Sequence, residues 1–224
     1  MRGLWIVFEG GDGVGKTTQI DLIATWLASP EGGSHDVVTT REPGGTDLGR
    51  QLREAVMHGD HVAPRAEALL YAADRAHHVA TVVRPALERG ATVVQDRYLD
   101  SSIVYQGGAR GLGDMVGEIS RWATEGATPD LTVVLDMAPA SDRLDRDLDR
   151  VERETAAHAE HIRQGYRDLA ALDPQRYAVV DAARSIDEVA ADVRKATVEA
   201  LARLQRADAT GTPPFGGVEP WGTP

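Results

Sequence analysis

The 224-residue sequence has no cysteine, no asparagine and only two lysines, Lys16 and Lys195. The absence of cysteine excludes disulfides and cysteine metal ligands. The absence of asparagine argues against a GTPase switch, because the guanine-reading motif Asn-Lys-x-Asp cannot be formed. Long apolar runs are missing as well, so no segment has the roughly 18 apolar residues of a membrane-spanning helix. What is left is a soluble globular protein without thiol chemistry.

Acidic residues outnumber basic ones and give a formal net charge of −11. A chain of this charge is poorly suited to wrapping a nucleic-acid backbone, whereas a small anionic ligand in a locally basic pocket is compatible with it. The amino-terminal stretch MRGLWIVFEGGDG lacks the pattern of a signal peptide. We therefore expect a cytoplasmic protein that binds neither nucleic acid nor membrane.

Five apolar, β-branched runs are typical of strands buried in a parallel sheet, because most do not alternate with polar residues. Helical patterns lie between them, including 16–27, 67–79 and a helix opened by the capping-box pair Ser185 and Glu188. This alternation predicts an α/β fold, a central five-stranded parallel sheet with helices on both faces. We expect one domain over 1–206 and a disordered Pro/Gly-rich tail over 207–224. The expected strands are Leu4–Glu9, Asp36–Thr40, Ala91–Asp96, Leu131–Asp136 and Arg176–Asp181.

Four of the expected strands end in an acid, namely Glu9, Asp96, Asp136 and Asp181. Ligands of open α/β sheets bind beyond the carboxyl ends of the strands, so these carboxylates are candidates for a ligand site. Asp96 is a candidate for holding Mg²⁺, and Asp136 competes with it for that role. Each of the four could instead start a loop or cap a helix.

The stretch from Gly10 to Thr17, here called the P-loop, matches the pattern G-x-x-x-x-G-K-[ST] between an expected strand and an expected helix. Glycines let backbone N–H groups turn toward phosphate oxygens, and the positive end of the next helix faces the same anion. Lys16 would bridge the β- and γ-phosphates, and Thr17 would ligate Mg²⁺. The motif predicts a three-layer P-loop NTPase fold that binds a nucleoside triphosphate, and leaves open where the γ-phosphate goes.

Further arginines follow two of the strands and indicate a second phosphorylated ligand. Arg41 opens the motif REPGGT, Arg53 lies shortly after it, and Arg97 follows Asp96. An arginine at a strand end can bind a phosphate through two parallel hydrogen bonds. For Arg41 and Arg53 the alternative is a surface loop and a surface helix.

Tyr71 and Arg75 are four residues apart and share one face of an expected helix. A ring and a guanidinium can together stack on and hydrogen-bond a flat base; the alternative is a half-buried tyrosine beside a solvated arginine. His77 and His78 point in different directions on a helix, so we interpret them as surface histidines rather than metal ligands. Residues 142–153, DRLDRDLDRVER, are either a solvated helix laced with salt bridges or a lid whose arginines close over the triphosphate.

Taken together, these motifs resemble those of the bacterial thymidylate kinase family, from about Arg2 to Leu204. Six motifs occur in the family's order: EGxxGxGKTT, TREPGGT, LLxAADRxxH, DRYxxSSxxYQGG, PDLTxxLD and DRxExE. The family moves the γ-phosphate of ATP onto dTMP, so the resemblance implies this reaction, with Mg²⁺ as cofactor. It also implies a homodimer packed through helices and suggests a cis bond between Glu42 and Pro43.

The resemblance implies a role for each matching position. Thr17 and Asp96 would serve Mg²⁺, and Asp12 would also lie near the deoxyribose 3′-hydroxyl of dTMP. Tyr71 stands where relatives carry a Phe that stacks on thymine. The base would further contact Arg75, Ser102 and Gln106, and the dTMP phosphate would contact Arg41, Arg53 and Arg97. ATP would be bound by Gly10, Gly11, Asp12, Gly13, Val14, Gly15, Lys16, Thr17 and Thr18.

Gly13 stands where some relatives carry an arginine in the P-loop, so the resemblance implies that lid arginines neutralise the transition state. The lid is shorter than in relatives; Arg146 and Arg150 are the better candidates, and Arg143 matches a helix position. The expected catalytic residues are thus Lys16, Arg41, Arg97, Arg146 and Arg150. The alternatives are another pyrimidine nucleotide or deoxynucleoside kinase, or a P-loop protein that binds nucleotides with weak or no kinase activity.

Overall fold

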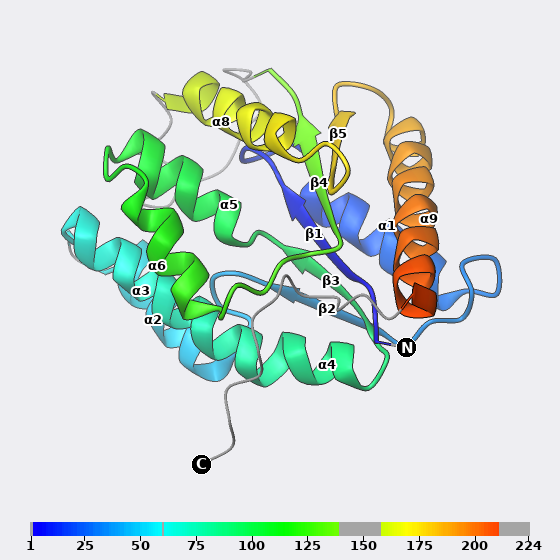
Figure 1. Ribbon diagram of the computed structural model, residues 1–224. Coiled ribbons are helices and arrows are strands. Elements are labelled where there is room, and N and C mark those ends of the chain that lie inside the picture. Colours follow the sequence, from blue (N-terminus) through cyan, green and yellow to red (C-terminus); the bar gives the residue numbers. More distant parts are fainter. Residues whose placement is uncertain (1, 60, 139–157, 211–224) are drawn as a thin grey trace, which may run out of the picture.

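The computed structural model of the chain describes residues 2–59, 61–138 and 158–210. Its centre is a parallel sheet of five strands in the order β2-β3-β1-β4-β5 (Figure 1). The predicted fold class is confirmed, and all five strands lie within one residue of the predicted bounds. The strands are β1 (Trp5–Glu9), β2 (Val37–Arg41), β3 (Thr92–Asp96), β4 (Leu131–Asp136) and β5 (Tyr177–Asp181).

Two long helices cover one face of the sheet, α1 (Lys16–Ala28) and α9 (Ile186–Thr210), side by side at the right of Figure 1. Their apolar stripes pack against the strand residues that point to this side, and the shared core contains Ile6, Phe8 and Leu135. Trp5 and Val7 of β1 point to the opposite face. Because both faces of the central strands β1, β3 and β4 are buried, these strands are apolar over most of their length rather than alternating, whereas the edge strands β2 and β5 are partly exposed.

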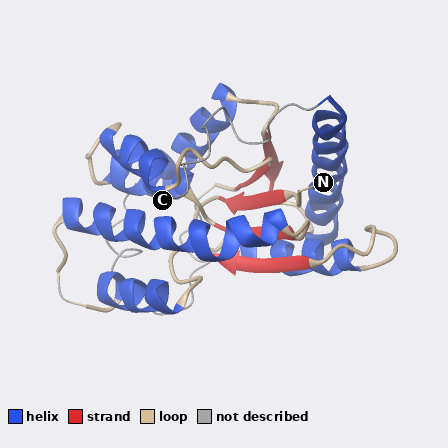
Figure 2. Cartoon of the chain, turned by 60° about the horizontal axis from the view of Figure 1, so that its bottom comes forward, coloured by secondary structure: helices blue, strands red, loops and turns tan. Residues whose placement is uncertain are grey.

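Helices on the opposite face complete the third layer, and Figure 2 shows the strands lying between helices. This side is built from α2 (Asp47–Met57), α3 (Pro64–His78), α4 (Arg84–Glu88), α5 (Leu99–Ser102) and α6 (Met115–Ala123), with α8 (Ala159–Leu172) over β4 and β5. Two π-helical segments, Val79–Val83 and Ile103–Ala109, continue α3 and α5.

The predicted capping box at the start of α9 is confirmed. The Ser185 backbone N–H donates to Glu188 Oε2 at 3.0 Å, and the Glu188 N–H donates to Ser185 Oγ at 3.4 Å. The helix continues to Thr210, past residue 207 where we predicted the tail to begin, so that boundary is wrong. The rest of the predicted tail and the whole predicted lid, 142–153, lie outside the described residues. Across the described ranges, no helix is long and apolar enough to cross a membrane.

Candidate active site

The carboxyl ends of β1, β2 and β3 open into a cavity of about 560 Å³. The register of the sheet pairs Asp96 with both Arg41 and Phe8, which brings motifs far apart in sequence to one edge. Most of the predicted site residues line this cavity, namely Asp12, Gly13, Gly15, Lys16, Thr17, Thr18, Arg41, Arg53, Tyr71, Arg75, Asp96, Arg97, Ser102 and Gln106.

The P-loop turns sharply between β1 and α1, and its glycines permit the turn. Gly13 and Gly15 have φ angles of 74° and 93°, which residues with a side chain rarely adopt. Gly10 also passes so close to β4 that a Cβ there would lie 2.5 Å from the Leu135 carbonyl oxygen. The side chain of Val14 fixes the loop to the rest of the fold, because it is buried in the core that α1 also packs against. The loop is therefore a fixed cradle in front of the amino terminus of α1.

Lys16 is buried inside this cradle, with 8% of its surface exposed. Its Nζ donates to the carbonyl oxygens of Gly11 and Gly10, at 2.8 and 3.2 Å. Burial lowers the pKa of Lys16 to about 8, while the nearby carboxylates of Asp96 and Asp12 act in the opposite direction. A bound anion would therefore stabilise the charged form of the Lys16 ammonium group.

The structure separates the two candidates for a magnesium carboxylate. Both oxygens of Asp136 accept from the Arg163 guanidinium, from Nε at 2.7 Å and Nη2 at 3.1 Å. Asp96, in contrast, has a buried oxygen, Oδ1, with no hydrogen-bond partner in the part of the chain that the structure describes. Because a buried carboxylate oxygen without a hydrogen bond is costly in free energy, Asp96 is suited to binding a cation. The charge of Asp136 is already balanced by Arg163.

The other two strand-end acids support loops. Glu9 is fully buried and accepts from the backbone N–H groups of Tyr98 and Ser101, at 2.8 and 3.2 Å. Burial raises the pKa of Glu9 to about 7, and the neighbouring Asp100 raises it further. Asp181 is exposed and accepts from the Ala183 N–H. Glu9 and Asp181 therefore take the loop-start role that we kept as the alternative.

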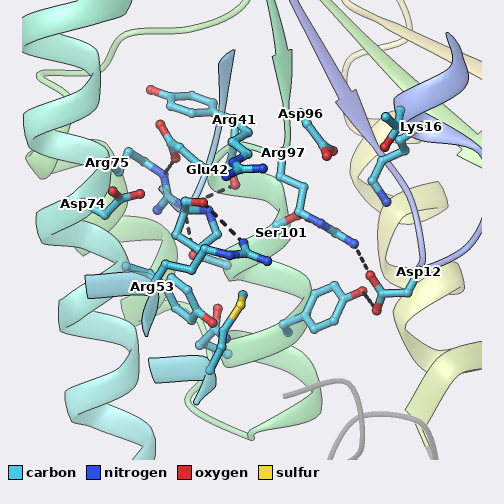
Figure 3. A pocket seen from close by; sticks show the side chains of 18 of the residues that line it. Asp12, Lys16, Arg41, Glu42, Arg53, Asp74, Arg75, Asp96, Arg97 and Ser101 are labelled. Carbon is cyan, nitrogen blue, oxygen red and sulfur yellow. Dashed lines mark hydrogen bonds and ion pairs between the residues drawn. The ribbon is translucent and has the colours of Figure 1, made fainter. Parts of the chain in front are cut away.

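Arg41, Arg53 and Arg97 extend into the space between α3 and the P-loop (Figure 3). Arg41 ends β2, Arg53 lies on α2, and Arg97 follows β3 with a φ angle of 63°. Arg41 is exposed and Arg53 is partly buried, and both line the cavity, so the structure brings the two predicted arginines together. The loop between them contains the suggested cis bond between Glu42 and Pro43, which is confirmed.

Arg97 is the most firmly held of the three. Its Nη2 forms an ion pair with Asp12 Oδ1 at 2.6 Å, drawn in Figure 3. Its Nη1 donates to Ser101 Oγ at 3.0 Å and to the Tyr166 hydroxyl at 3.1 Å. The guanidinium also lies 5.3 Å from the centre of the Tyr105 ring. The sequence analysis assigned no role to Tyr105 or Tyr166, since neither lies beside Arg97 in the chain.

Arg75 is a buried residue, only 3% exposed, so the alternative of a solvated arginine is wrong. Its Nε donates to Glu42 Oε2 at 2.8 Å, and its two terminal nitrogens donate to Ser120 Oγ and Ser102 Oγ at 2.9 and 3.0 Å. Tyr71 is also buried, at 8% exposed. The structure therefore fixes a ring and a guanidinium beside each other at one end of the cavity.

The interpretation of His78 as a surface histidine is wrong. The side chain is fully buried, with Nδ1 2.8 Å from Glu42 Oε1 and Nε2 2.6 Å from Thr40 Oγ1. His78 and Arg75 thus hold the two oxygens of Glu42 from one helix. Their spacing of three residues on α3 was the available signal, whereas burial could not be read from two adjacent histidines.

Asp74 is a second buried acid that the sequence analysis missed. It lines the cavity, is 1% exposed, and its Oδ2 has no hydrogen-bond partner within the described ranges. Burial raises the pKa of Asp74 to about 6, with a further contribution from the charge of Glu42. Figure 3 places it beside Arg75 and Glu42.

The sequence profile described as "Thymidylate kinase" matches residues 8–193 of the chain. This chain belongs to the thymidylate kinase family. A thymidylate kinase of Clavibacter michiganensis subsp. michiganensis (strain NCPPB 382) is 55% identical over 201 residues, 87% of this chain and 94% of that protein. One of Leifsonia xyli subsp. xyli (strain CTCB07) is 56% identical over 200 residues, 86% of this chain and 93% of that protein.

A solved structure of this family shows the same arrangement. The crystal structure of thymidylate kinase from Ehrlichia chaffeensis superposes with a TM-score of 0.73 at 29% identity, covering 87% of this chain and 98% of that one. Membership of the thymidylate kinase family accounts for the pairing of a P-loop with a second cationic pocket. The candidate lid residues Arg143, Arg146 and Arg150 lie outside the described residues, so their place in this family member stays a prediction.

Proposed function

We propose that this chain transfers the γ-phosphate of ATP to dTMP, giving dTDP and ADP. The observation that carries the proposal is a single cavity with two anion sites. The P-loop and Lys16 lie at one side, and Arg41, Arg53 and Arg97 lie beside it. A base-sized end with Tyr71 completes the cavity. Two phosphorylated ligands in one cavity are what phosphoryl transfer between nucleotides requires.

Lys16 supports the donor role. Its ammonium is bound to carbonyl oxygens of the P-loop, which β- and γ-phosphate oxygens can replace. Backbone N–H groups at the start of α1 face the same position. These groups are set before the ligand arrives, so they stabilise developing charge without reorganising.

Thr17 and Asp96 are the residues that would hold Mg²⁺. The Thr17 side chain is exposed in the first turn of α1, and Asp96 offers its unpaired buried oxygen. Such oxygen ligands suit a hard cation that fills the rest of its shell with phosphate and water. When bound, the ion neutralises charge on the donor phosphates.

The three arginines would orient the dTMP phosphate for in-line attack. A phosphate monoester is largely a dianion near neutral pH, so the attacking oxygen needs no general base. Positioning and charge neutralisation then supply most of the rate enhancement. This explains a cavity rich in arginine that holds no histidine among its described lining residues.

Asp12 would lie near the 3′-hydroxyl of the sugar. It is held by Arg97 and accepts from the Tyr105 hydroxyl at 3.2 Å. A fixed carboxylate beside a hydroxyl favours the sugar that can donate to it. Arg146 and Arg150 would come over the transferred phosphoryl group from the lid, because Gly13 leaves the P-loop without an arginine.

A homodimer would form through α3 and its neighbours. Four exposed apolar residues, Ala66, Leu69, Ala73 and Ala80, follow one side of the helix and its π-helical continuation at helical spacing. Helices α2 and α6 contact α3 and lie beside it in Figure 1. They add exposed Leu48, Met115 and Trp122. Exposed apolar residues gathered on neighbouring helices support a protein interface at this place.

The test is ADP release from ATP and Mg²⁺ with a panel of acceptors: dTMP, dUMP, UMP, dCMP, AMP, GMP, thymidine and none. We expect ADP release with dTMP and formation of dTDP. Preference for another acceptor would keep the kinase and move the base assignments. Measurable ATP binding without transfer to any acceptor would contradict the proposal and favour a nucleotide-binding protein.

A further inference from the structure

Glu67 is a fully buried carboxylate next to the base end of the cavity. It lies in the first turns of α3, one helical turn before Tyr71. Its Oε1 accepts from Gln106 Nε2 at 3.0 Å, and its Oε2 accepts from Arg110 Nη2 at 3.3 Å. Glu67 does not line the cavity, whereas Gln106 does.

The contact between Glu67 and Gln106 fixes which end of the Gln106 amide faces which way. A carboxylate can only accept hydrogen bonds, so it must be met by the amide NH₂ group and not by the amide oxygen. The ion pair with Arg110 offsets part of the cost of burying this carboxylate, because a buried charge with a partner is far less costly than one without. The Gln106 oxygen, the only acceptor of this amide, is then left for a ligand in the cavity.

The neighbouring Arg75 has the opposite polarity. It is held by Glu42, Ser120 and Ser102, and a guanidinium can only donate. The base end of the cavity therefore presents one acceptor, from Gln106, and one donor group, from Arg75. Thymine and uracil match this pair with their N3–H donor and O4 acceptor. Cytosine has an acceptor at N3 and a donor amine at C4, so it opposes both.

We propose that Glu67 is a positioning residue that selects bases with an N3–H by holding the Gln106 amide in one orientation. The inference rests on the proposed transfer to dTMP and deepens it. Glu67, Tyr71 and Arg75 recur at intervals of four on α3, so one helix aligns all three elements of base recognition. Without Glu67, the amide could turn and offer its NH₂ group to the N3 atom of cytosine.

The test compares kcat/KM for dTMP, dUMP and dCMP in the wild type, Glu67→Met and Glu67→Gln. Methionine removes the acceptor at similar volume, and glutamine retains one oxygen. In Glu67→Met we expect the ratio of dCMP to dTMP turnover to rise about 10-fold or more, through the acceptor KM. The ratio of dUMP to dTMP and the KM for ATP should stay unchanged. Glu67→Gln should lie between the wild type and Glu67→Met.

Two controls separate selection from a general loss of structure. Glu199→Gln changes an exposed carboxylate on α9, on the other face of the sheet, and should leave every ratio unchanged. In a Gln106→Leu background, Glu67→Met should no longer alter the dCMP to dTMP ratio, since the amide on which it acts is gone. If Glu67→Met lowers all three acceptors equally, Glu67 is only structural and the inference is overturned.

A substrate-side measurement needs only the wild-type chain, so it can overturn the inference even if the variants fail to fold. We expect dCMP and 3-methyl-dTMP each to be used at least about 100-fold less well than dTMP. Comparable use of dTMP, dCMP and 3-methyl-dTMP would overturn the inference while leaving the kinase activity in place. No transfer to dTMP at all would instead contradict the proposed function.

Discussion

The surroundings of Lys16 favour loss of a proton from its ammonium group. Burial lowers its pKa to about 8, and its hydrogen bonds to the carbonyls of Gly10 and Gly11 replace water only in part. Phosphate oxygens that take the place of those carbonyls bring negative charge and raise the pKa again. Protonation of this one side chain is therefore coupled to binding of the triphosphate.

We predict that ATP binding takes up protons between pH 8 and 9, where the free Lys16 is partly neutral and the bound one is charged. Near pH 6.5 the side chain is already charged in the free protein, so uptake there should vanish. Isothermal titration calorimetry in two buffers of different ionisation enthalpy measures the uptake. Lys16→Ala should abolish it and lower kcat/KM by about 100-fold or more. Equal uptake in Lys16→Ala would contradict the coupling.

Asp74 should make the folded chain less stable as pH rises. Burial raises its pKa from the ordinary value near 4 to about 6, so between these values the native state holds a proton that the unfolded state releases. The free energy of unfolding therefore falls as pH rises through this window. We predict that Asp74→Asn is about 1 kcal/mol more stable than the wild type at pH 8, or about 2–4 °C in Tm.

The advantage of the Asp74→Asn variant should shrink toward pH 4, where Asp74 is protonated in the native state and about half protonated in the unfolded state. Thermal unfolding at pH 4, 6 and 8 measures the difference. Asp21→Asn, on an exposed position of α1, is the matched control and should show no such trend. A stability difference that does not change with pH would show that the charge of Asp74 is not responsible.

At the residue scale, positions defined by a motif could be predicted and their supporting network could not. The P-loop pattern located Lys16 because glycine spacing and helix position dictate the cradle. The buried group of Glu42, Asp74 and His78 escaped prediction, because whether an acid is buried depends on segments distant in sequence. The residues alone left Asp96 and Asp136 as competitors for Mg²⁺, and only the family resemblance favoured Asp96; the contacts of Arg163 with Asp136 supply the physical reason.

At the scale of helices, α2 and α3 approach each other closely enough that one position must be glycine. A Cβ at Gly49 would lie 2.1 Å from Asp74 Oδ1 and 3.0 Å from Thr46 Oγ1, the oxygen that caps α2. Arg53 follows Gly49 by one helical turn. The position of an acceptor-site arginine is thus coupled to the packing of α2 on α3.

We predict that Gly49→Ala destabilises the chain although alanine favours helix by about 1 kcal/mol. The overlap must be relieved by moving α2 or Asp74, so Tm should fall and the KM for dTMP should rise while the KM for ATP stays constant. Gly117→Ala on α6 is the matched control, because the nearest atoms there belong to the end of the Arg121 side chain. A Gly49→Ala variant as stable as Gly117→Ala would contradict the prediction.

Strands were easier to predict than helices, for a physical reason. The buried strands β1, β3 and β4 are apolar runs with clear ends, and the partly exposed edge strands β2 and β5 begin and end beside charged residues, so all five could be located to within one residue. The two π-helical segments gave no such signal, since Val79–Val83 is β-branched and Ile103–Ala109 contains two glycines. The strand order follows from crossover packing, which no local pattern reports.

At the scale of the whole molecule, α3 has two working sides. One side carries Glu67, Tyr71, Arg75 and His78 toward the cavity and the polar network beside it. The other exposes the apolar stripe of Ala66, Leu69, Ala73 and Ala80. If a second copy covers that stripe, dimer formation supports the helix that organises base recognition.

We predict that the wild type is a dimer at micromolar concentration and that the double variant Leu69→Glu/Ala73→Glu is a monomer. In a two-fold symmetric interface, the two new carboxylates would be buried opposite the same two carboxylates of the partner subunit. Burying these like charges costs far more free energy than is lost with the apolar contact area. Light scattering coupled to size exclusion measures the mass. The monomeric variant should also show a raised KM for dTMP, because the outer side of α3 is no longer supported.

Leu172→Glu provides the control for this dimer prediction. Leu172 is 81% exposed at the end of α8, away from α3, so the charge there should leave both the mass and the KM for dTMP unchanged. An effect of Leu172→Glu on the mass would place the interface on α8 instead. A wild type that is monomeric at micromolar concentration would contradict the dimer, and the apolar stripe on α3 would then need a different partner.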